Sequence, residues 1–262
     1  MAAQDAPGTE EEPAWSQETG LPLVVRTAHF DVRVRAGEST VATWPLSPAE
    51  IAATAEAVLP TVEARLETPL RERVSLLVVP AEAAPAACPP RAAALPARRR
   101  IVLFAGPETL EPRALAAFLA HELGHQLTFD RWGALGADRR LTEGLATWAA
   151  EPYWLAWRGW ASLDAAVADL LATQALAPLT TAPHGCLVAA ERDVYYSVWA
   201  SFVDYLLRHY GWERLAAALT LPPAGEGEAD YRGAFGHSLA ELACAWEREL
   251  GRTPASCPAA AP

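Results

Sequence analysis

The spacing of apolar residues in the first part of the chain alternates between the periods of strands and helices. Leu21–Val34 is rich in β-branched residues and alternates apolar with polar positions near its end, which predicts a strand or hairpin. Ser47–Leu66 carries apolar residues at helical spacing and predicts an amphipathic helix. Arg73–Pro80 and Arg100–Ala105 are apolar runs typical of buried strands, whereas the Ala/Pro-rich segment Ala81–Ala97 predicts a loop.

The remainder of the chain carries its apolar residues mainly at helical spacing. Pro112–Arg131 predicts one helix, because Pro112 suits a first helical position and the apolar residues recur on one face. Gly133 is positioned to end this helix. Four further helices are expected, over Ser162–Gln174, Val194–His209, Trp212–Leu219 and Ser238–Leu250.

This order of elements predicts an α+β fold in a single domain over residues 21–251. A small mixed-sheet lobe is expected over residues 21–110, followed by a mainly helical lobe over residues 111–251. A chain of 262 residues is long enough for one such domain with a full core. Met1–Gly20 has no hydrophobic periodicity and predicts a disordered acidic tail, and residues 252–262 predict a Pro/Ala-rich tail.

The predicted helix over Pro112–Arg131 contains the motif His121-Glu122-Leu123-Gly124-His125. Positions i and i+4 share one face of a helix, so both imidazoles can point at one metal ion. Glu122 projects beside that face, where it can hold and deprotonate a metal-bound water. Buried polar groups without partners are costly, and a divalent metal would supply the partner. The motif therefore predicts a zinc hydrolase.

Catalytic zinc usually takes three protein ligands and a water, so the chain must offer a third ligand. Glu143 is favoured, because Thr142 can cap a helix that carries Glu143 in its first turn and runs to Glu151-Pro152. A loop over Trp132–Leu141 would fold this helix back on the first and bring Glu143 to the metal. The alternative third ligands are Asp130, Asp138 and His184.

Two segments carry a family resemblance. The histidine motif, followed by Leu141-Thr142-Glu143-Gly144-Leu145-Ala146, resembles the gluzincin metallopeptidases. More narrowly, it is similar to small bacterial peptidase-MA-like domains related to the catalytic domain of aminopeptidase N. The segment Tyr195–Leu206, followed by His209-Tyr210-Gly211, resembles the family's helix that opens with a tyrosine and ends in a glycine turn.

The resemblance implies a zincin-like fold in which an active-site helix precedes a mainly helical lobe, and it implies peptide or protein substrates. It implies three ligands for Zn²⁺, namely His121, His125 and Glu143. Glu122 would be the general base, and Tyr196 stands where the family keeps its transition-state tyrosine. Tyr195 takes that place if the register differs by one residue.

The chain also departs from the family pattern. It contains no asparagine and no G-x-M-E-N motif before the metal helix, so amino-terminal trimming is unsupported. Thr147 stands where many gluzincins carry an acidic residue that orients a histidine. Arg139-Arg140, between the two ligand helices, is interpreted as a solvated turn, with a contact to a substrate carboxylate as the alternative. The rival functions are a catalytically inactive, zinc-stabilised binding or scaffold protein and a zinc hydrolase of a non-peptide amide.

The charge of the chain limits the classes of binding partner, whereas its cysteine content is compatible with more than one cellular compartment. The net charge is −11 and the chain has no lysine, which argues against nucleic acid as a partner. No apolar run reaches the ~18 residues of a membrane span, so no transmembrane segment is expected. Cys244 and Cys257 could close a disulfide, which would fit a secreted or periplasmic protein. Free thiols, and with them a cytoplasmic protein, are the alternative.

Overall fold

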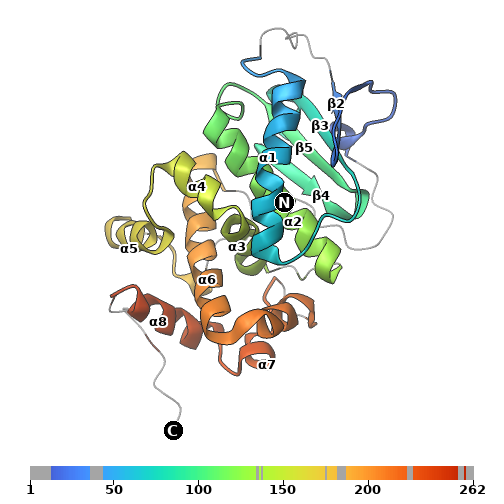
Figure 1. The fold of residues 1–262 in the computed structure, drawn as a ribbon. Helices are drawn as coiled ribbons and strands as arrows, with labels where there is room; N and C mark the ends of the chain where they lie inside the picture. The colour runs from blue at the N-terminus through green and yellow to red at the C-terminus, as the bar shows by residue number, and fades with distance from the viewer. Residues whose placement is uncertain are drawn as a thin grey trace. The chain divides into compact units, whose positions relative to one another are not determined.

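The computed structural model divides the chain into two compact units, drawn as ribbons in Figure 1. We call them the sheet unit, formed by Met1–Ala134 with Ala149–Arg158, and the helical unit, formed by Leu135–Trp148 with Gly159–Pro262. The structure describes residues 13–35, 44–133, 136, 138–174, 176–181, 187–222, 227–252 and 257. Both helices and strands are present, so the coarse prediction of a mixed α+β protein is confirmed.

The sheet unit is built on a five-stranded mixed sheet with the order β1-β2-β3-β5-β4. Its strands are β1 (Leu23–Arg26), β2 (Phe30–Val34), β3 (Val74–Pro80), β4 (Ala92–Leu95) and β5 (Arg100–Ala105). β2, β3 and β5 run parallel, and β1 and β4 pair antiparallel at the two edges. β3 and β5 are buried almost throughout, as their continuous apolar sequences predict.

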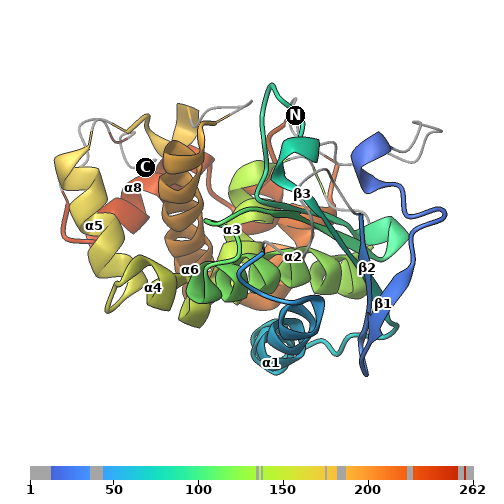
Figure 2. The same ribbon diagram turned by 90° about the horizontal axis from the view of Figure 1, so that it is seen from above.

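Helices α1 (Pro48–Leu66) and α2 (Pro112–Trp132) pack against each other, and Figure 2 shows both on one side of the sheet. α1 begins at a capping box, in which the Ser47 hydroxyl accepts from the Glu50 amide and the Glu50 carboxylate accepts from the Ser47 amide. α2 ends at Gly133, whose φ is 79°. The short helix α4 (Glu151–Arg158) packs on α2. These helices bury the apolar faces that their periodicity predicts.

The opposite face of the sheet is covered by the segment before β1. Its single-turn helix η1 (Ala14–Ser16) places the Trp15 ring 5.6 Å from the ring of Phe104, between centroids. Ser16 is fully buried, and Leu21 packs against the same apolar cluster. The prediction of a disordered tail over Met1–Gly20 is therefore wrong for residues 13–20, because Trp15 has a sheet face to cover. Residues 1–12 lie outside the described part of the chain.

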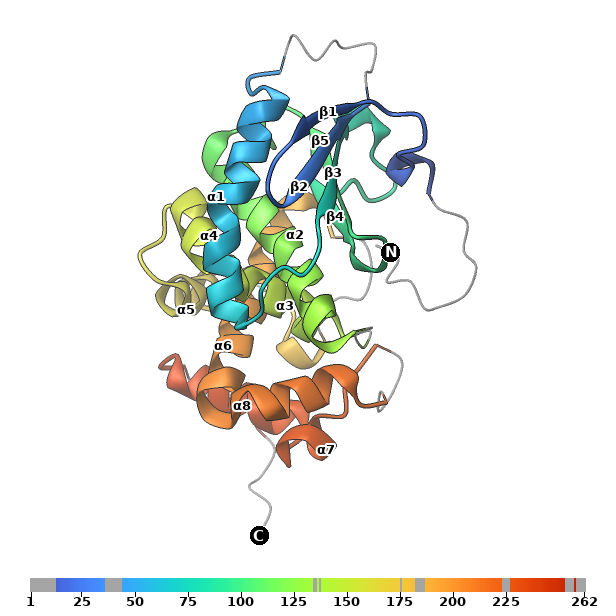
Figure 3. The ribbon, with the colours of Figure 1, turned by 45° about the vertical axis from the view of Figure 1, so that its right-hand side comes forward.

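The helical unit is organised around the long helix α6 (Figure 3). Its described helices are α3 (Arg139–Ala149), α5 (Leu163–Thr173), η5 (Leu179–Thr181), α6 (Ala189–Thr220), α7 (Tyr231–Phe235) and α8 (Leu239–Glu249). α5, α7 and α8 each pack on α6, which is broken at Gly211, where φ is 75°. The break explains why the sequence predicts two helices where the ribbon is continuous. Cys244 and Cys257 form a disulfide, so that predicted pairing is confirmed.

Three local predictions are wrong. Ala81–Ala97 is not one loop, because it contains η3 (Ala81–Ala83), β4 and η4 (Pro96–Arg98). The second ligand helix starts at Arg139, so Thr142 lies inside it and donates its hydroxyl to the Asp138 carbonyl instead of capping. Pro152 does not stop that helix but occupies the first turn of α4, where a missing N–H costs nothing. None of the helices in the described part of the chain combines the length and apolar character that crossing a bilayer requires.

Candidate metal centre

The two histidines of the motif face each other across one turn of α2. Their Nε2 atoms lie 3.2 Å apart, and their ring centroids are 4.8 Å apart at an interplanar angle of 84°. His121 is 5 % exposed and Glu122 is 7 % exposed, so the polar stripe of α2 is buried as its position among apolar residues predicts. His125 is partly exposed.

The distance between the two imidazole nitrogens fits a shared metal ion. Two Zn–N bonds of about 2.0–2.1 Å at a tetrahedral angle place their nitrogens about 3.3 Å apart. The observed separation of 3.2 Å matches that value. Two imidazole nitrogens at this separation can bind one cation together when both are unprotonated.

Aromatic residues of α4 hold the helix face that bears the histidines. The ring of Trp154, only 2 % exposed, lies 6.0 Å from the ring of His121. Trp157 contacts both Trp154 and Phe118, with ring centroids 5.1 and 4.8 Å away. This packing fixes the orientation of α2 within the sheet unit, and it gives His121 a rigid apolar neighbour.

In the helical unit, Glu143 lies in the second turn of α3 and is 9 % exposed. The next residue, Gly144, lies directly against the backbone of α6. A Cβ atom there would lie 2.7 Å from the carbonyl oxygen of Trp199 and 2.9 Å from a methyl group of Val203. Glycine is therefore required beside Glu143, because a side chain would push α3 away from α6.

His121, His125 and Glu143 form a group that could hold a metal ion. Each offers one ligand atom, and these atoms all lie within 4.8 Å of one another. The set combines two imidazole nitrogens with one carboxylate oxygen, which suits zinc and other divalent transition metals. The three residues are those that the sequence predicts as ligands.

The alternative third ligands are engaged elsewhere or lie outside the described residues. The carboxylate of Asp130 accepts hydrogen bonds from Arg99 at 2.7 Å and from Gln126 at 3.1 Å. Asp138 is buried and accepts from Arg140 and Tyr231. His184 falls among the residues that the structure does not describe. The observations thus favour Glu143.

The two adjacent tyrosines of α6 have different neighbours. The Tyr195 hydroxyl accepts a hydrogen bond from the backbone amide of Ala177 at 3.2 Å. The Tyr196 hydroxyl lies 3.5 Å from Nη2 of Arg139, which donates to it. Burial raises the pKa of the Tyr196 phenol well above its ordinary value of 10.0, the charge of Glu143 adds to the rise, and Arg139 opposes it. Tyr196, rather than Tyr195, thus lies within electrostatic reach of a predicted metal ligand.

The interpretation of Arg139-Arg140 as a solvated turn is wrong, because both residues belong to α3. Arg140 is 2 % exposed and pairs with Asp138, and Arg139 contacts Tyr196. The sequence does hold a signal for this arrangement. Arg139 precedes Glu143 by four residues, and this spacing predicts that both lie on the same face of one helix.

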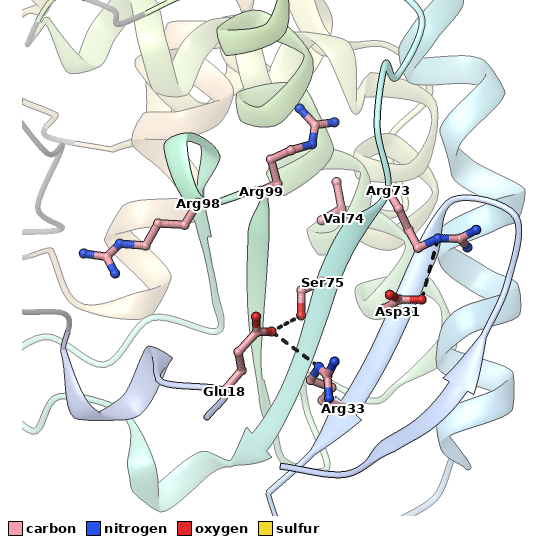
Figure 4. Close-up of a pocket in the computed structure, with 8 residues that line it drawn as sticks. All are labelled: Glu18, Asp31, Arg33, Arg73, Val74, Ser75, Arg98 and Arg99. Carbon is pink, nitrogen blue, oxygen red and sulfur yellow. Dashed lines mark hydrogen bonds and ion pairs between the residues drawn. The ribbon is translucent and has the colours of Figure 1, made fainter. Parts of the chain in front are cut away.

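A polar depression of about 210 Å³ opens on the sheet unit (Figure 4). It is lined by four arginines, two carboxylates, Val74 and Ser75. Its charges are matched locally: Arg33 pairs with Glu18 at 3.6 Å and Arg73 with Asp31 at 3.7 Å. None of its lining residues belongs to the candidate metal centre, and we assign it no function.

Comparisons with protein-family models and with curated proteins found no match to this chain.

Proposed function

We propose that the protein is a zinc metallopeptidase of the gluzincin type with a zincin-like fold. The observation that carries the proposal is the ligand group itself. The ligand atoms of Glu143 and of the two histidines of the H-E-x-x-H helix all lie within 4.8 Å of one another. Three protein ligands leave a fourth position for water, which is the arrangement of catalytic rather than structural zinc. The resemblance of the motifs to gluzincins supports peptide bonds as the substrate.

Zinc in this position would polarise the scissile carbonyl and lower the pKa of a water molecule toward neutrality. Glu122, on α2 between the two histidine ligands, would accept the proton of that water during attack on the carbonyl carbon. The same carboxylic acid would then donate the proton to the amine that leaves. Tyr196 would donate a hydrogen bond to the carbonyl oxygen as negative charge develops on it.

The first test is the metal content of wild type and Glu143→Ala, both prepared without added zinc and measured by elemental analysis. We expect one zinc per chain in wild type and loss of zinc in the variant. The matched control is Glu191→Ala, which removes an exposed glutamate from the first turn of α6 and should keep the metal. A wild type that binds no zinc, even when zinc is supplied, would overturn the proposal.

The second test separates an enzyme from a zinc-stabilised scaffold. Glu122→Gln should retain zinc and lose at least about 10²-fold in turnover of a peptide library, because it removes the general base. Normal turnover in this variant would refute the role of Glu122. Zinc-loaded wild type that cleaves no peptide in the library would instead favour a scaffold or a hydrolase of non-peptide amides.

A further inference from the structure

Arg139 is held between two aromatic side chains of α6. Its Nη2 atom lies 3.5 Å from the Tyr196 hydroxyl oxygen, and its Cζ atom lies 5.7 Å from the centroid of the Trp199 ring. The Tyr196 and Trp199 rings are themselves 5.6 Å apart. The contact with the indole face restrains the guanidinium, because a cation over a tryptophan ring is attracted by its quadrupole.

The direction of the hydrogen bond follows from the chemistry of the two groups. A guanidinium has five N–H donors and no acceptor. At the contact with Arg139, the Tyr196 oxygen must therefore be the acceptor. Its own O–H then points away from Arg139, toward an acceptor other than the guanidinium. A neighbouring positive charge also makes the phenol a stronger donor.

The backbone places this pair beside Glu143. Arg139 precedes Glu143 by four residues in α3, so the two side chains leave the same face of the helix. The neighbouring Tyr195 has a different arrangement, because its hydroxyl oxygen accepts from the amide of Ala177. Of the two tyrosines, Tyr196 is the one whose hydroxyl is oriented by a side chain of the ligand helix.

We propose that Arg139 is a positioning residue that orients the Tyr196 hydroxyl to donate to the reacting carbonyl oxygen. The inference rests on the proposed peptidase function and adds a residue to it. Arg139 acts through Tyr196 and does not itself contact the reacting atoms. The role requires a donor with a positive charge at this position, so lysine should replace arginine in part and glutamine should not.

The kinetic test uses zinc-loaded Arg139→Gln and Arg139→Lys. We expect kcat to fall about 10-fold in Arg139→Gln, with little change in KM. This loss is smaller than the roughly 10²- to 10³-fold loss of kcat expected when a transition-state donor is removed outright. Arg139→Lys should recover part of the loss. The control is Arg232→Gln, which removes an arginine that is 68 % exposed on α7 and should leave kcat unchanged.

A double-mutant cycle with Tyr196→Phe distinguishes positioning from a structural role. Arg139→Gln should cause no further loss of kcat in the Tyr196→Phe background, because the group it orients is gone. Additive losses would overturn the inference. Unchanged kcat in Arg139→Gln alone, with an active wild type, would overturn it while leaving the proposed function intact. A zinc-loaded wild type without turnover would overturn the proposed function and this inference with it.

A readout without catalysis tests the contact directly. In metal-free protein labelled with ¹³C at tyrosine Cζ, Arg139→Gln should shift the Tyr196 resonance and leave the Tyr195 resonance in place. Tyr196→Phe and Tyr195→Phe assign the two signals. An unshifted Tyr196 resonance would show that Arg139 does not hold the hydroxyl, and would overturn the inference whatever the activity.

Discussion

Two buried polar clusters in this protein are built from different kinds of polar atoms. In the helical unit, the Asp138 carboxylate accepts hydrogen bonds from the Arg140 amide and guanidinium, from the Tyr231 hydroxyl at 3.0 Å and from the Ala229 amide at 3.0 Å. Arg140 also donates to the Leu179 carbonyl. Burial lowers the pKa of Arg140, but the hydrogen bond and charge of Asp138 outweigh this effect and raise that pKa overall, so the guanidinium stays charged. Donors and acceptors match, and the cluster is a structural link between three segments.

The second cluster is the group of His121, His125 and Glu143. Two of its members, His121 and Glu143, are buried, as the first cluster is, but the group is composed differently. Its members offer two imidazole nitrogens and a carboxylate oxygen, and these ligand atoms all lie within 4.8 Å of one another. Burial therefore does not distinguish a structural cluster from a binding site. The kind of atom does, because imidazole nitrogens grouped with a carboxylate oxygen are ligands that a divalent transition metal binds.

The largest effect is expected from breaking the matched cluster. Asp138→Ala leaves the buried Arg140 with only the half-exposed Glu228 carboxylate, 3.8 Å away, as a partner of opposite charge. It should lower the free energy of unfolding by about 3–5 kcal/mol. Urea unfolding of metal-free protein measures the loss. Asp169→Ala, which removes an exposed aspartate from α5, is the control and should change little. Equal stability of the two variants would mean that the Asp138 network does not hold the helical unit together.

The next effect is expected from metal binding to the group of His121, His125 and Glu143. Zinc at about a hundredfold excess over its Kd should raise the free energy of unfolding by about 2.7 kcal/mol, because only the folded chain presents the assembled ligands. Glu143→Ala should lose most of this gain at the same zinc concentration, and Asp169→Ala should keep it. Denaturant titrations with and without zinc give both values. A gain that survives in Glu143→Ala would remove Glu143 from the ligand set.

A smaller effect is expected where α3 meets α6. Gly144→Ala puts a methyl group 2.7 Å from the Trp199 carbonyl oxygen and should cost about 1–3 kcal/mol through overpacking. It should also weaken zinc binding, because it displaces the adjacent Glu143. Gly106→Ala is the matched control, since its Cβ would meet only the Ala81 side chain at an ordinary 3.4 Å. Unchanged zinc affinity in Gly144→Ala would show that α3 can shift without moving its carboxylate.

The smallest effect is expected at Glu18, a carboxylate that also pairs with arginines but is itself only partly buried. Burial raises the pKa of Glu18, but the Ser75 hydroxyl and the charges of Arg100 and Arg33 outweigh it, so the pKa lies below its ordinary 4.5. A lowered folded-state pKa means stability that is present above 4.5 and lost as pH falls through the folded value. Glu18→Gln should therefore cost less than about 1 kcal/mol at pH 7, and the cost should vanish in that acid range.

Unfolding titrations from pH 7 to pH 3 measure this dependence, with the exposed Glu82→Gln as control. If Glu18→Gln lowered the free energy of unfolding as much as Asp138→Ala does, burial would not explain the difference expected between the two carboxylate–arginine pairs. A cost that stays constant down to pH 3 would mean that Glu18 is not stabilised as a carboxylate.

Errors in the sequence-based prediction fall where local sequence carries little preference. β4 consists of Ala92-Ala93-Ala94-Leu95, and alanine is less frequent in strands than elsewhere. It is a strand because its backbone pairs with β5. Residues 13–20 are polar and aperiodic, yet Trp15 orders them by packing on Phe104. Each of these elements depends on a partner outside its own segment: β4 needs the strand that follows it, and Trp15 needs Phe104, which is distant in the chain.

Local sequence patterns are enough to predict the helix of the histidine motif, the strands of the sheet interior and the kinds of ligand atom in the candidate site. These follow from local rules, because helical spacing alone brings His121 and His125 to one face. Tertiary structure decided which carboxylate is grouped with them and which tyrosine lies beside Glu143. It also decided that Asp138 is matched by Arg140 and Tyr231. Those choices depend on how loops and helices pack over long separations, where residue type and spacing leave several partners equally available.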